Sequence, residues 1–203
     1  MRIFLTLLLF GLCLTIRPVL AQERPSSPRG EVSTQVGGSF VEGSYTGGSW
    51  IVVVYSRPIL RGRTNIFGSG ANYGKDLYAG APVWRVGANK STRFMTETDL
   101  QFGSSVLKAG EYSLFVEFEN GEWTLIFSTY GAKSSGRAPE EGLWGSYEYT
   151  PEKDALRVKM MLSRLEMSID QFTIAFMNMT QQGGNLAMIW ENELAMTPFT
   201  VAK

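Results

Sequence analysis

The sequence contains no histidine, and its one cysteine, Cys13, lies within the first 21 residues. The lack of histidine excludes Ser-His-Asp and Cys-His nucleophilic machinery, histidine general bases and every metal site that needs an imidazole ligand. Removal of the N-terminal segment would also leave no disulfide, no thiolate nucleophile and no cysteine ligand for zinc or an iron–sulfur cluster. Carboxylates, lysine, arginine, tyrosine, serine and threonine remain for chemistry. We therefore predict no catalytic residue, no metal and no cofactor, and the composition argues against an enzyme without excluding one.

Charged residues are also few, and basic and acidic side chains are equal in number. Only 19% of the residues are charged, with 19 basic and 19 acidic side chains, whereas 44% are hydrophobic. This balance is typical of a globular chain rather than a disordered one. Without the first 21 residues the chain would have 182 residues, 17 basic and 19 acidic side chains, and a net charge of −2. A nucleic-acid partner is not expected, because such partners select a strongly basic surface.

The N-terminus has the pattern of a secretory signal peptide over residues 1–21. Arg2 provides a positive start, an apolar run covers residues 3–16, and Ala21 ends a stretch suited to cleavage. The run is shorter than the ~18 apolar residues that a membrane-spanning helix needs, so no transmembrane segment is expected in the mature chain. We predict cleavage after Ala21 and a secreted or periplasmic protein of the bacterial envelope. The alternative is an uncleaved N-terminal anchor.

The clearest local prediction is a β-hairpin over residues 111–128. Apolar and polar residues alternate on both sides of Asn120 and Gly121, and this dipeptide is the strongest signal for a two-residue hairpin turn. A turn at this place puts the apolar residues on one face, so the register and the hydrophobic pattern agree. The predicted pairs are Phe118 with Trp123, Val116 with Leu125 and Leu114 with Phe127.

Further strands are expected at short intervals along the rest of the chain. Residues 50–55 are dense in β-branched and aromatic side chains, and no window of 12 or more residues keeps a helical period. Residues 22–31 are predicted to be a flexible lead-in. Residues 32–203 are predicted to form a single antiparallel β-sandwich or jelly-roll-like domain, an all-β fold. The other strands are expected at residues 32–36, 93–98, 100–107, 156–162, 172–176, 186–190 and 199–201.

Arginines cluster where the predicted strand 50–55 ends. Three of them lie within seven residues, beside Pro58 and Gly62, and a fourth follows Trp84 farther along the chain. Arginine at a strand end can present a rigid set of donors to a carboxylate or a phosphate. If these loops converge, they line a binding site for a small anionic or saccharide ligand. The candidate ligand-binding residues are Arg57, Arg61, Arg63, Tyr73, Trp84, Arg85 and Asn89.

The same residues have an alternative, structural role. Arginine can stack on tryptophan and pair with acidic residues, and so tie loops to the sandwich. Among the tryptophans, Trp84 and Trp144 lie near glycine-rich loops and are predicted at the surface, whereas Trp123 and Trp190 are predicted in the core. The 14-residue stretch 130–143 is long for a sandwich connection, and loops of this length are often functional or disordered.

Acidic residues offer two further alternatives. Glu119 and Glu122 are expected to face each other at the hairpin tip, where with Glu117 they form either a weak calcium site or a solvated end. A glycoside hydrolase needs two carboxylates across a cleft, and spacing alone selects no pair. The candidates for such a pair are Asp76, Glu111, Asp154, Asp170, Glu191 and Glu193.

Short motifs follow one another in a fixed order along nearly the whole mature chain, from about Val32 to Val201. They include Tyr55-Ser56-Arg57-Pro58, Arg61-Gly62-Arg63, Ile66-Phe67-Gly68, Tyr73-Gly74, Trp84-Arg85, Gly87-Ala88-Asn89, Ala109-Gly110-Glu111-Tyr112, Trp123-Thr124, Trp144-Gly145-Ser146-Tyr147, Leu156-Arg157-Val158 and Trp190-Glu191-Asn192. As an ordered set, they resemble the secreted bacterial family called domain of unknown function 2911. Members of that family usually carry threonine and glutamate where this chain has Val86 and Lys90, which weakens any family role for those two positions. The resemblance implies an exported β-domain and brings no activity with it.

Three functions follow from these observations, in order of preference. The first is a non-catalytic binding module whose site, lined by arginine, tryptophan and asparagine, takes a small anionic or saccharide ligand. The second is an envelope assembly protein that binds another protein through an edge strand. The third is a carboxylate-dependent hydrolase that acts on an envelope glycan.

Overall fold

A computed structural model of the chain describes residues 26–203. The predicted signal peptide and residues 22–25 of the predicted lead-in lie outside the described residues. The first strand, β1 (Arg29–Val36), begins three residues before the strand predicted at 32–36, so residues 29–31 belong to the sheet rather than to the lead-in. Among residues 26–203, no helix has both the length and the hydrophobicity needed to cross a membrane.

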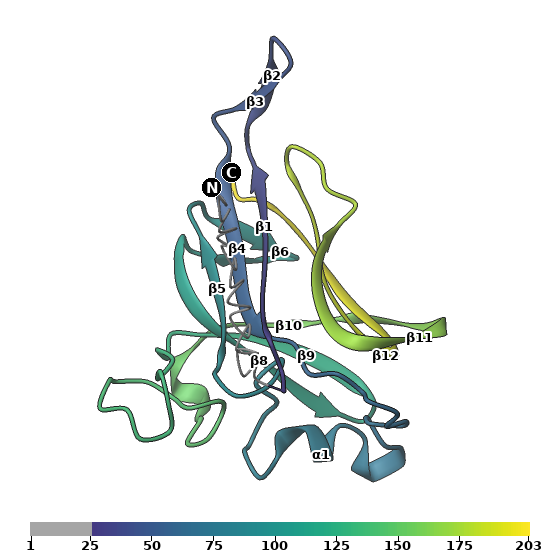
Figure 1. Cartoon of the computed structure of the whole chain (residues 1–203). Coiled ribbons are helices and arrows are strands. Elements are labelled where there is room, and N and C mark those ends of the chain that lie inside the picture. The colour runs from purple at the N-terminus through teal and green to yellow at the C-terminus, as the bar shows by residue number, and fades with distance from the viewer. Residues whose placement is uncertain (1–25) are drawn as a thin grey trace, which may run out of the picture.

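Two antiparallel sheets pack face to face, which confirms the predicted all-β sandwich (Figure 1). The main sheet has six strands in the order β1, β4 (Ser49–Ser56), β5 (Thr92–Thr96), β8 (Gly110–Glu119), β9 (Glu122–Ser128) and β10 (Asp154–Lys159). The second sheet has four strands in the order β11 (Met161–Met177), β12 (Gly183–Val201), β6 (Leu100–Phe102) and β7 (Ser105–Leu107). The remaining strands, β2 (Ser39–Val41) and β3 (Ser44–Thr46), form a separate hairpin that projects from one end of the molecule (Figure 1).

Helical structure within residues 26–203 is limited to single turns that connect strands. These are the 3-10 turn η1 (Gly70–Asn72), the short helix α1 (Lys75–Tyr78) and the 3-10 turn η2 (Pro151–Lys153). The sequence predicts no helix, because a four-residue helix is too short to display a helical period.

The predicted hairpin is confirmed with its register. Phe118 pairs with Trp123, Val116 with Leu125, and Leu114 with Phe127. All six side chains are buried on the face that packs against the second sheet. Glu119 faces Glu122 at the tip, as expected, and the Nζ atom of Lys159 on β10 lies 2.7 Å from the Glu122 carboxylate. A cation from the neighbouring strand therefore relieves the repulsion between the two carboxylates.

Aromatic side chains from both sheets and from the 66–84 connection fill one end of the core. The ring of Trp84 stacks on that of Trp190 at 6.3 Å and meets the edge of Phe172 at 5.1 Å. Phe67, which comes from the connection, lies 5.2 Å from Trp123. Such rings bury large areas and prefer these offset and edge-on geometries. The predicted core positions of Trp123 and Trp190 are confirmed.

Three strand predictions differ from the structure. The segment predicted as one strand at 100–107 is the hairpin of β6 and β7, because the chain turns back at Gly103, which has a positive φ of 55°, and Leu100 pairs with Leu107. The strand predicted at 156–162 is interrupted at Met160, whose backbone N–H donates to the carbonyl of Trp123 while its side chain is buried. The chain leaves the main sheet at this residue and enters the second sheet, a change of partner that alternation alone does not reveal. The strands predicted at 186–190 and 199–201 are both parts of β12, because the polar residues between them also pair with β11.

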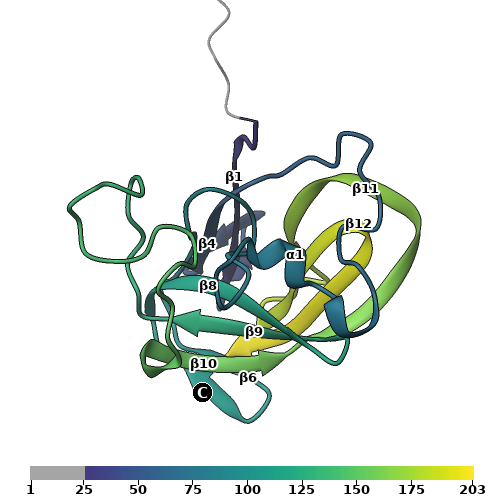
Figure 2. The same ribbon diagram turned by 90° about the horizontal axis from the view of Figure 1, so that it is seen from below.

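The face of the main sheet that points away from the second sheet is called the outer face here. Residues 129–150 cross one part of it, and in both ribbon views the 130–143 loop stands out on the side away from β11 and β12 (Figures 1 and 2). The segment is held by a small second core. Its buried members are Val83, Phe115, Ile126, Leu143 and Tyr149.

A polar network also ties this segment to the sheet. The buried Tyr149 hydroxyl donates to Oδ2 of Asp154 at 2.7 Å, and Nη1 of Arg157 donates to the same oxygen at 2.9 Å. Arg157 also pairs with Glu117 of β8. Burial raises the pKa of Tyr149, and the Asp154 carboxylate raises it further, because it accepts a hydrogen bond only from the neutral phenol.

We expect Tyr149→Phe to lower the free energy of unfolding by about 1–3 kcal/mol at neutral pH, because the buried carboxylate loses a donor. The folded chain holds the Tyr149 proton more tightly than the unfolded chain. The stabilisation is therefore complete below the unfolded pKa near 10.0 and declines as the pH rises above it. Urea unfolding at pH 8 and pH 11 should show a smaller loss of stability with pH in the variant than in the wild type. Equal losses in the two proteins would contradict this assignment.

Candidate functional site

The seven predicted ligand-binding residues do not share one cavity, and the three arginines after β4 all donate to backbone carbonyls. Arg57 is half-buried and joins the end of β4 to β11, with Nε donating to the carbonyl of Phe172 at 3.3 Å. Arg63 closes its own turn by donating to the carbonyls of Ile59 and Leu60 at 2.9 and 3.0 Å. These contacts favour the structural role for both side chains. Arg61 is exposed and reaches back to the start of the described chain, where it donates to the carbonyl of Ser26 at 3.2 Å.

Trp84 was predicted at the surface, and this prediction is wrong. Only 1% of the residue is exposed. Its backbone forms a two-way bridge with Val116, with both N–H···O distances at 2.8 Å, so the glycine-rich segment around it is drawn onto the main sheet. Its indole N–H donates to the carbonyl of Gly87 at 3.2 Å, which satisfies the polar atom inside the core.

Arg85 is buried beneath a second turn rather than directed into a cavity. Its guanidinium carbon lies 5.0 Å from the centre of the Tyr147 ring, and Nη1 donates to the carbonyl of Asn89 at 3.3 Å. Gly145 lies against the guanidinium, where a Cβ atom would stand 2.6 Å from Nη1, and its positive φ of 65° favours glycine. Arg85 thus holds the 85–89 turn against the 144–147 turn.

Asn89 lines a cavity of about 700 Å³ between the outer face of the main sheet and the 130–143 loop. We call this cavity the loop pocket. Its floor is formed by the ends of β4 and β5, and Trp144 forms part of its wall. Most of its lining surface is apolar, with charged groups distributed around it. The residues that line it are Ser27, Arg29, Val54, Tyr55, Ser56, Asn89, Lys90, Ser91, Arg93, Ala132, Lys133, Ser134, Glu140 and Trp144.

Positive charge predominates in the loop pocket. Of its four cations, Arg29 is paired with Glu31, and Arg93 is paired with Glu111 and donates to the carbonyl of Tyr130 at 2.7 Å. Lys90 and Lys133 take part in none of the six ion pairs found among residues 26–203.

The loop pocket has one carboxylate among its lining residues, that of Glu140. Its Oε1 atom accepts a hydrogen bond from the Ser134 hydroxyl at 2.5 Å. This bond, a backbone N–H and the charge of Lys90 lower the pKa of Glu140. The carboxylate therefore stays ionised at neutral pH, and the loop closes on itself through it.

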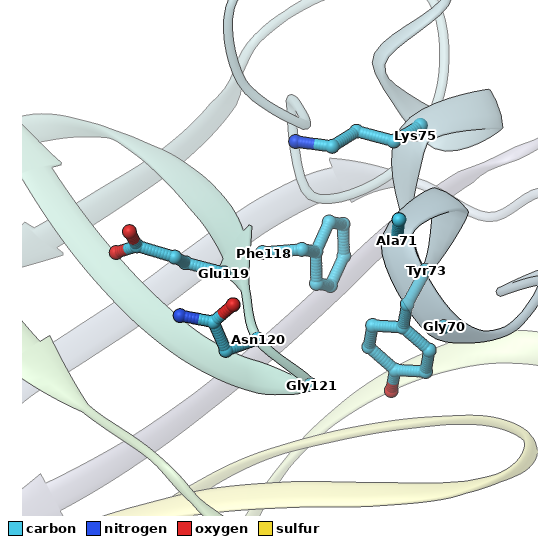
Figure 3. Close-up of a pocket in the computed structure, with 8 residues that line it drawn as sticks. All are labelled: Gly70, Ala71, Tyr73, Lys75, Phe118, Glu119, Asn120 and Gly121. Atoms are coloured by element: carbon cyan, nitrogen blue, oxygen red, sulfur yellow. The ribbon is translucent and has the colours of Figure 1, made fainter.

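Tyr73 lies in a different place, within the 66–84 connection between η1 and α1. It is shared by two adjoining cavities of about 640 and 420 Å³, which we call together the Tyr73 groove. The larger cavity lies between η1 and the tip of the β8–β9 hairpin, with Lys75 on one side and Glu119 and Asn120 on the other (Figure 3). The smaller cavity is lined by β11, β12 and the 65–70 turn. Its charged residues are Arg164, Glu191 and Glu193.

The Tyr73 ring is fixed between the two cavities. It stacks on Phe67 at 6.0 Å, and its hydroxyl accepts a hydrogen bond from the indole N–H of Trp123 at 2.9 Å. Burial raises the pKa of Tyr73, so the phenol remains neutral. The ring therefore provides a rigid, uncharged junction between the cavities.

Glu191 and Glu193 both line the smaller cavity, but their carboxylates have different partners. Both carboxylate oxygens of Glu191 are occupied, because they accept the backbone N–H groups of Asn65 and Ile66, the second at 3.1 Å. Glu193 faces Arg164 across the β11–β12 pair, but the two side chains do not form an ion pair. Burial raises the pKa of Glu193, Arg164 lowers it, and the nearby Glu191 raises it.

Parts of both sites, but not the sites themselves, were predictable from the sequence. Trp144, the long 130–143 loop and Glu193 were each singled out there, and the structure places all three at cavities. Lys90 and Lys133 were missed as binding residues, because a single lysine in a loop belongs to no motif or spacing that would indicate a binding site. The unusual length of the loop was the one available signal for Lys133.

Residues 26–203 contain no group of three acidic, histidine or cysteine side chains arranged to hold a metal ion. At the hairpin tip, where a calcium site was an alternative, Glu117 pairs with Arg157 and Glu122 pairs with Lys159. These contacts favour the solvated end.

Comparisons with known proteins give one match. Residues 36–199 match the family model described as "Protein of unknown function (DUF2911)". No curated protein and no solved structure matches the chain. The matched range covers the two sheets apart from most of β1 and the last two residues of β12, and it includes every residue of the two sites except Ser27 and Arg29.

Proposed function

The chain belongs to the DUF2911 family of proteins of unknown function, and from that premise we propose that it is an exported bacterial envelope protein that binds a small anionic ligand in the loop pocket without catalysing a reaction. The observation that carries this proposal is the position of Lys90 and Lys133, two cations that take part in none of the ion pairs found among residues 26–203, in the lining of a cavity of about 700 Å³. This volume lies within the range that small-molecule sites occupy.

The lining of the loop pocket supports an anion with an apolar part. Lys90 and Lys133 can each donate to a carboxylate or phosphate oxygen, and such charge-assisted bonds are stronger than neutral ones. The half-buried Trp144 offers an apolar surface beside them. The hydroxyl of Ser134 is already held by Glu140, so the loop is ordered before a ligand enters. A preorganised site loses less entropy on binding.

Export is proposed from the leader sequence. The positive start, the apolar run of residues 3–16 and the small residue Ala21 match a cleaved secretory signal. A mature chain without cysteine needs no disulfide chemistry to fold outside the cytoplasm. Mass spectrometry of the protein purified from the envelope fraction should give a chain that begins at Gln22, and an intact chain starting at Met1 would contradict the proposal.

The test is a thermal-shift screen of the mature chain with inorganic phosphate, dicarboxylates and sugar phosphates. Ligand at ~100 times its Kd stabilises the folded state by about 2.7 kcal/mol, which raises Tm by about 5–10 °C for a domain of this size. We expect the shift to fall as ionic strength rises, because salt screens exposed charges.

The matched control lies in the same loop. The double variant Lys90→Ala/Lys133→Ala should lose the shift, whereas Arg137→Ala, which removes an exposed cation that does not line the pocket, should keep it. An unchanged thermal shift in the double variant would show that the ligand binds elsewhere, and it would reject this site. The absence of a shift with every anion would reject the function.

A further inference from the structure

We infer that the Tyr73 groove is a second binding site, separate from the loop pocket, and that its ligand is a linear, hydroxyl-rich saccharide that crosses Tyr73 from one cavity into the other. The two sites share no lining residue. The inference is therefore independent of the proposed anion site.

Each cavity of the groove holds unpaired charges of both signs. Lys75 and Glu119 flank the larger cavity, and Arg164 and Glu193 flank the smaller one. None of these four side chains takes part in the six ion pairs found among residues 26–203. A ligand with a net charge would be attracted by one member of each pair and repelled by the other. A neutral ligand rich in hydroxyl groups satisfies both, because a hydroxyl donates to a carboxylate and accepts from an ammonium or guanidinium group.

The groove is also lined by uncharged side chains that both donate and accept hydrogen bonds. Side-chain amides are present in both cavities, from Asn120 in the larger and Asn192 in the smaller. Figure 3 shows Lys75, Glu119 and Asn120 arranged around Phe118, with Tyr73 beside them. Polar groups that donate and accept, next to aromatic carbon, suit a sugar ring, which has hydroxyls at its edge and C–H groups on its faces.

The backbone of β12 is irregular at the smaller cavity, and this irregularity affects the placement of two side chains that line it. Glu191 has a positive φ of 52°, which costs a non-glycine residue about 1–3 kcal/mol. The β11–β12 register shifts between Arg164 and Ile169, next to the same residue. Bulges in β-ladders re-aim side chains and are frequent beside functional sites. Here the irregularity lets Glu191 hold the 65–66 backbone, while Glu193 two residues later is left free in the cavity.

The length of the groove selects a linear ligand over a single sugar or amino acid. The two cavities adjoin through Gly70 and Tyr73 and together exceed the volume that a monosaccharide fills. An extended chain with a sugar ring on each side of Tyr73 uses both sets of charges at once. Loss of a contact in either cavity should then weaken the same ligand.

The experiment titrates the mature protein with linear trisaccharides of glucose and of N-acetylglucosamine, followed by NMR chemical shifts at up to about 10 mM, ten times a millimolar Kd. We expect one of them to bind. Glu193→Ala and Lys75→Ala, one in each cavity, should each weaken that binding by about 10- to 100-fold. Glu166→Ala, an exposed acid on β11 outside the groove, should leave it unchanged. The thermal midpoint of each variant checks its fold, and Glu193→Gln replaces Glu193→Ala if the latter does not fold.

Three results would overturn the inference. These are no binding of any trisaccharide, binding that neither groove variant weakens, and binding that Glu166→Ala weakens as much as Glu193→Ala does. The Lys90→Ala/Lys133→Ala variant separates the two sites. It should bind the trisaccharide normally even though it has lost the anion response, and loss of trisaccharide binding in that variant would assign both ligands to the loop pocket.

Discussion

Replacement of Trp84 by alanine should lower the free energy of unfolding by about 3–5 kcal/mol, a large fraction of the 5–15 kcal/mol that holds a typical domain together. The side chain is almost completely buried, and its ring contacts aromatic partners from the main sheet and from the second sheet. Alanine leaves a cavity at the place where the two sheets meet. The indole also satisfies the carbonyl of Gly87, which would lose its donor inside the core.

Urea unfolding of purified protein measures this loss directly. Trp50→Ala is the matched control, because Trp50 is 44% exposed on β4 and its truncation should change stability by about 0.5 kcal/mol or less. Similar losses in the two variants would show that Trp84 does not hold the sheets together. A loss in Trp84→Ala accompanied by a smaller m-value would instead indicate that the variant no longer unfolds in a two-state transition.

Gly142→Ala should destabilise the protein by about 2–3 kcal/mol and abolish the thermal shift with anions. Gly142 has a φ of 123°, a conformation that an alanine adopts only with strain. A Cβ atom there would also lie 2.5 Å from the carbonyl group of Gly131. That carbonyl accepts from the Leu143 N–H at 3.0 Å, and the Leu143 carbonyl accepts from the Lys133 N–H at 2.9 Å. The added methyl group forces the two ends of the loop apart and moves Lys133 out of the pocket wall.

Gly136→Ala tests the same loop without the strain. Gly136 is not among the residues with positive φ, and its Cβ atom would meet the ring of Trp144 at 3.4 Å, an ordinary contact. We expect this variant to keep both its stability and its anion response. Calorimetric unfolding with and without phosphate compares the two variants. A normal anion response in Gly142→Ala would show that the pocket does not depend on the closed loop.

The sequence predicted the hairpin of β8 and β9 well, although it missed the shorter hairpins β2–β3 and β6–β7. The 111–128 hairpin was correct to the residue pair, because a turn with two φ-permissive residues fixes the register and alternation fixes the face. Alternation could not show that the chain changes sheets at Met160. A strand that continues in one sheet and a strand that crosses to another have the same local pattern, and the difference depends on the distant partner Trp123.

The candidate site was harder to predict, because arginine serves as a donor to backbone carbonyls as readily as to ligands. Arg57 and Arg63 found their acceptors in Phe172, Ile59 and Leu60, contacts that no spacing rule anticipates. The surface prediction for Trp84 failed for a related reason. Nearby glycines were taken as a sign of an open loop, whereas Trp84 forms a backbone bridge to Val116, and Gly87 lies so close to the end of β4 that a Cβ atom there would stand 2.6 Å from the carbonyl oxygen of Ser56.

The pairing of β12 with β6 sets the order in which the chain can acquire its tertiary structure. Gln101 pairs with Thr200, and the Ala202 N–H donates to the carbonyl of Asp99, so the second sheet joins segments about half the sequence apart. The ribosome delivers the chain from its N-terminus, at about 5–20 residues per second, so β6 has no partner strand in β12 until β12 has been synthesised. Until then the main sheet has no cover for its inner face. The pairing of β6 with β12 therefore has a high loop-closure cost, and the second sheet is completed late in folding.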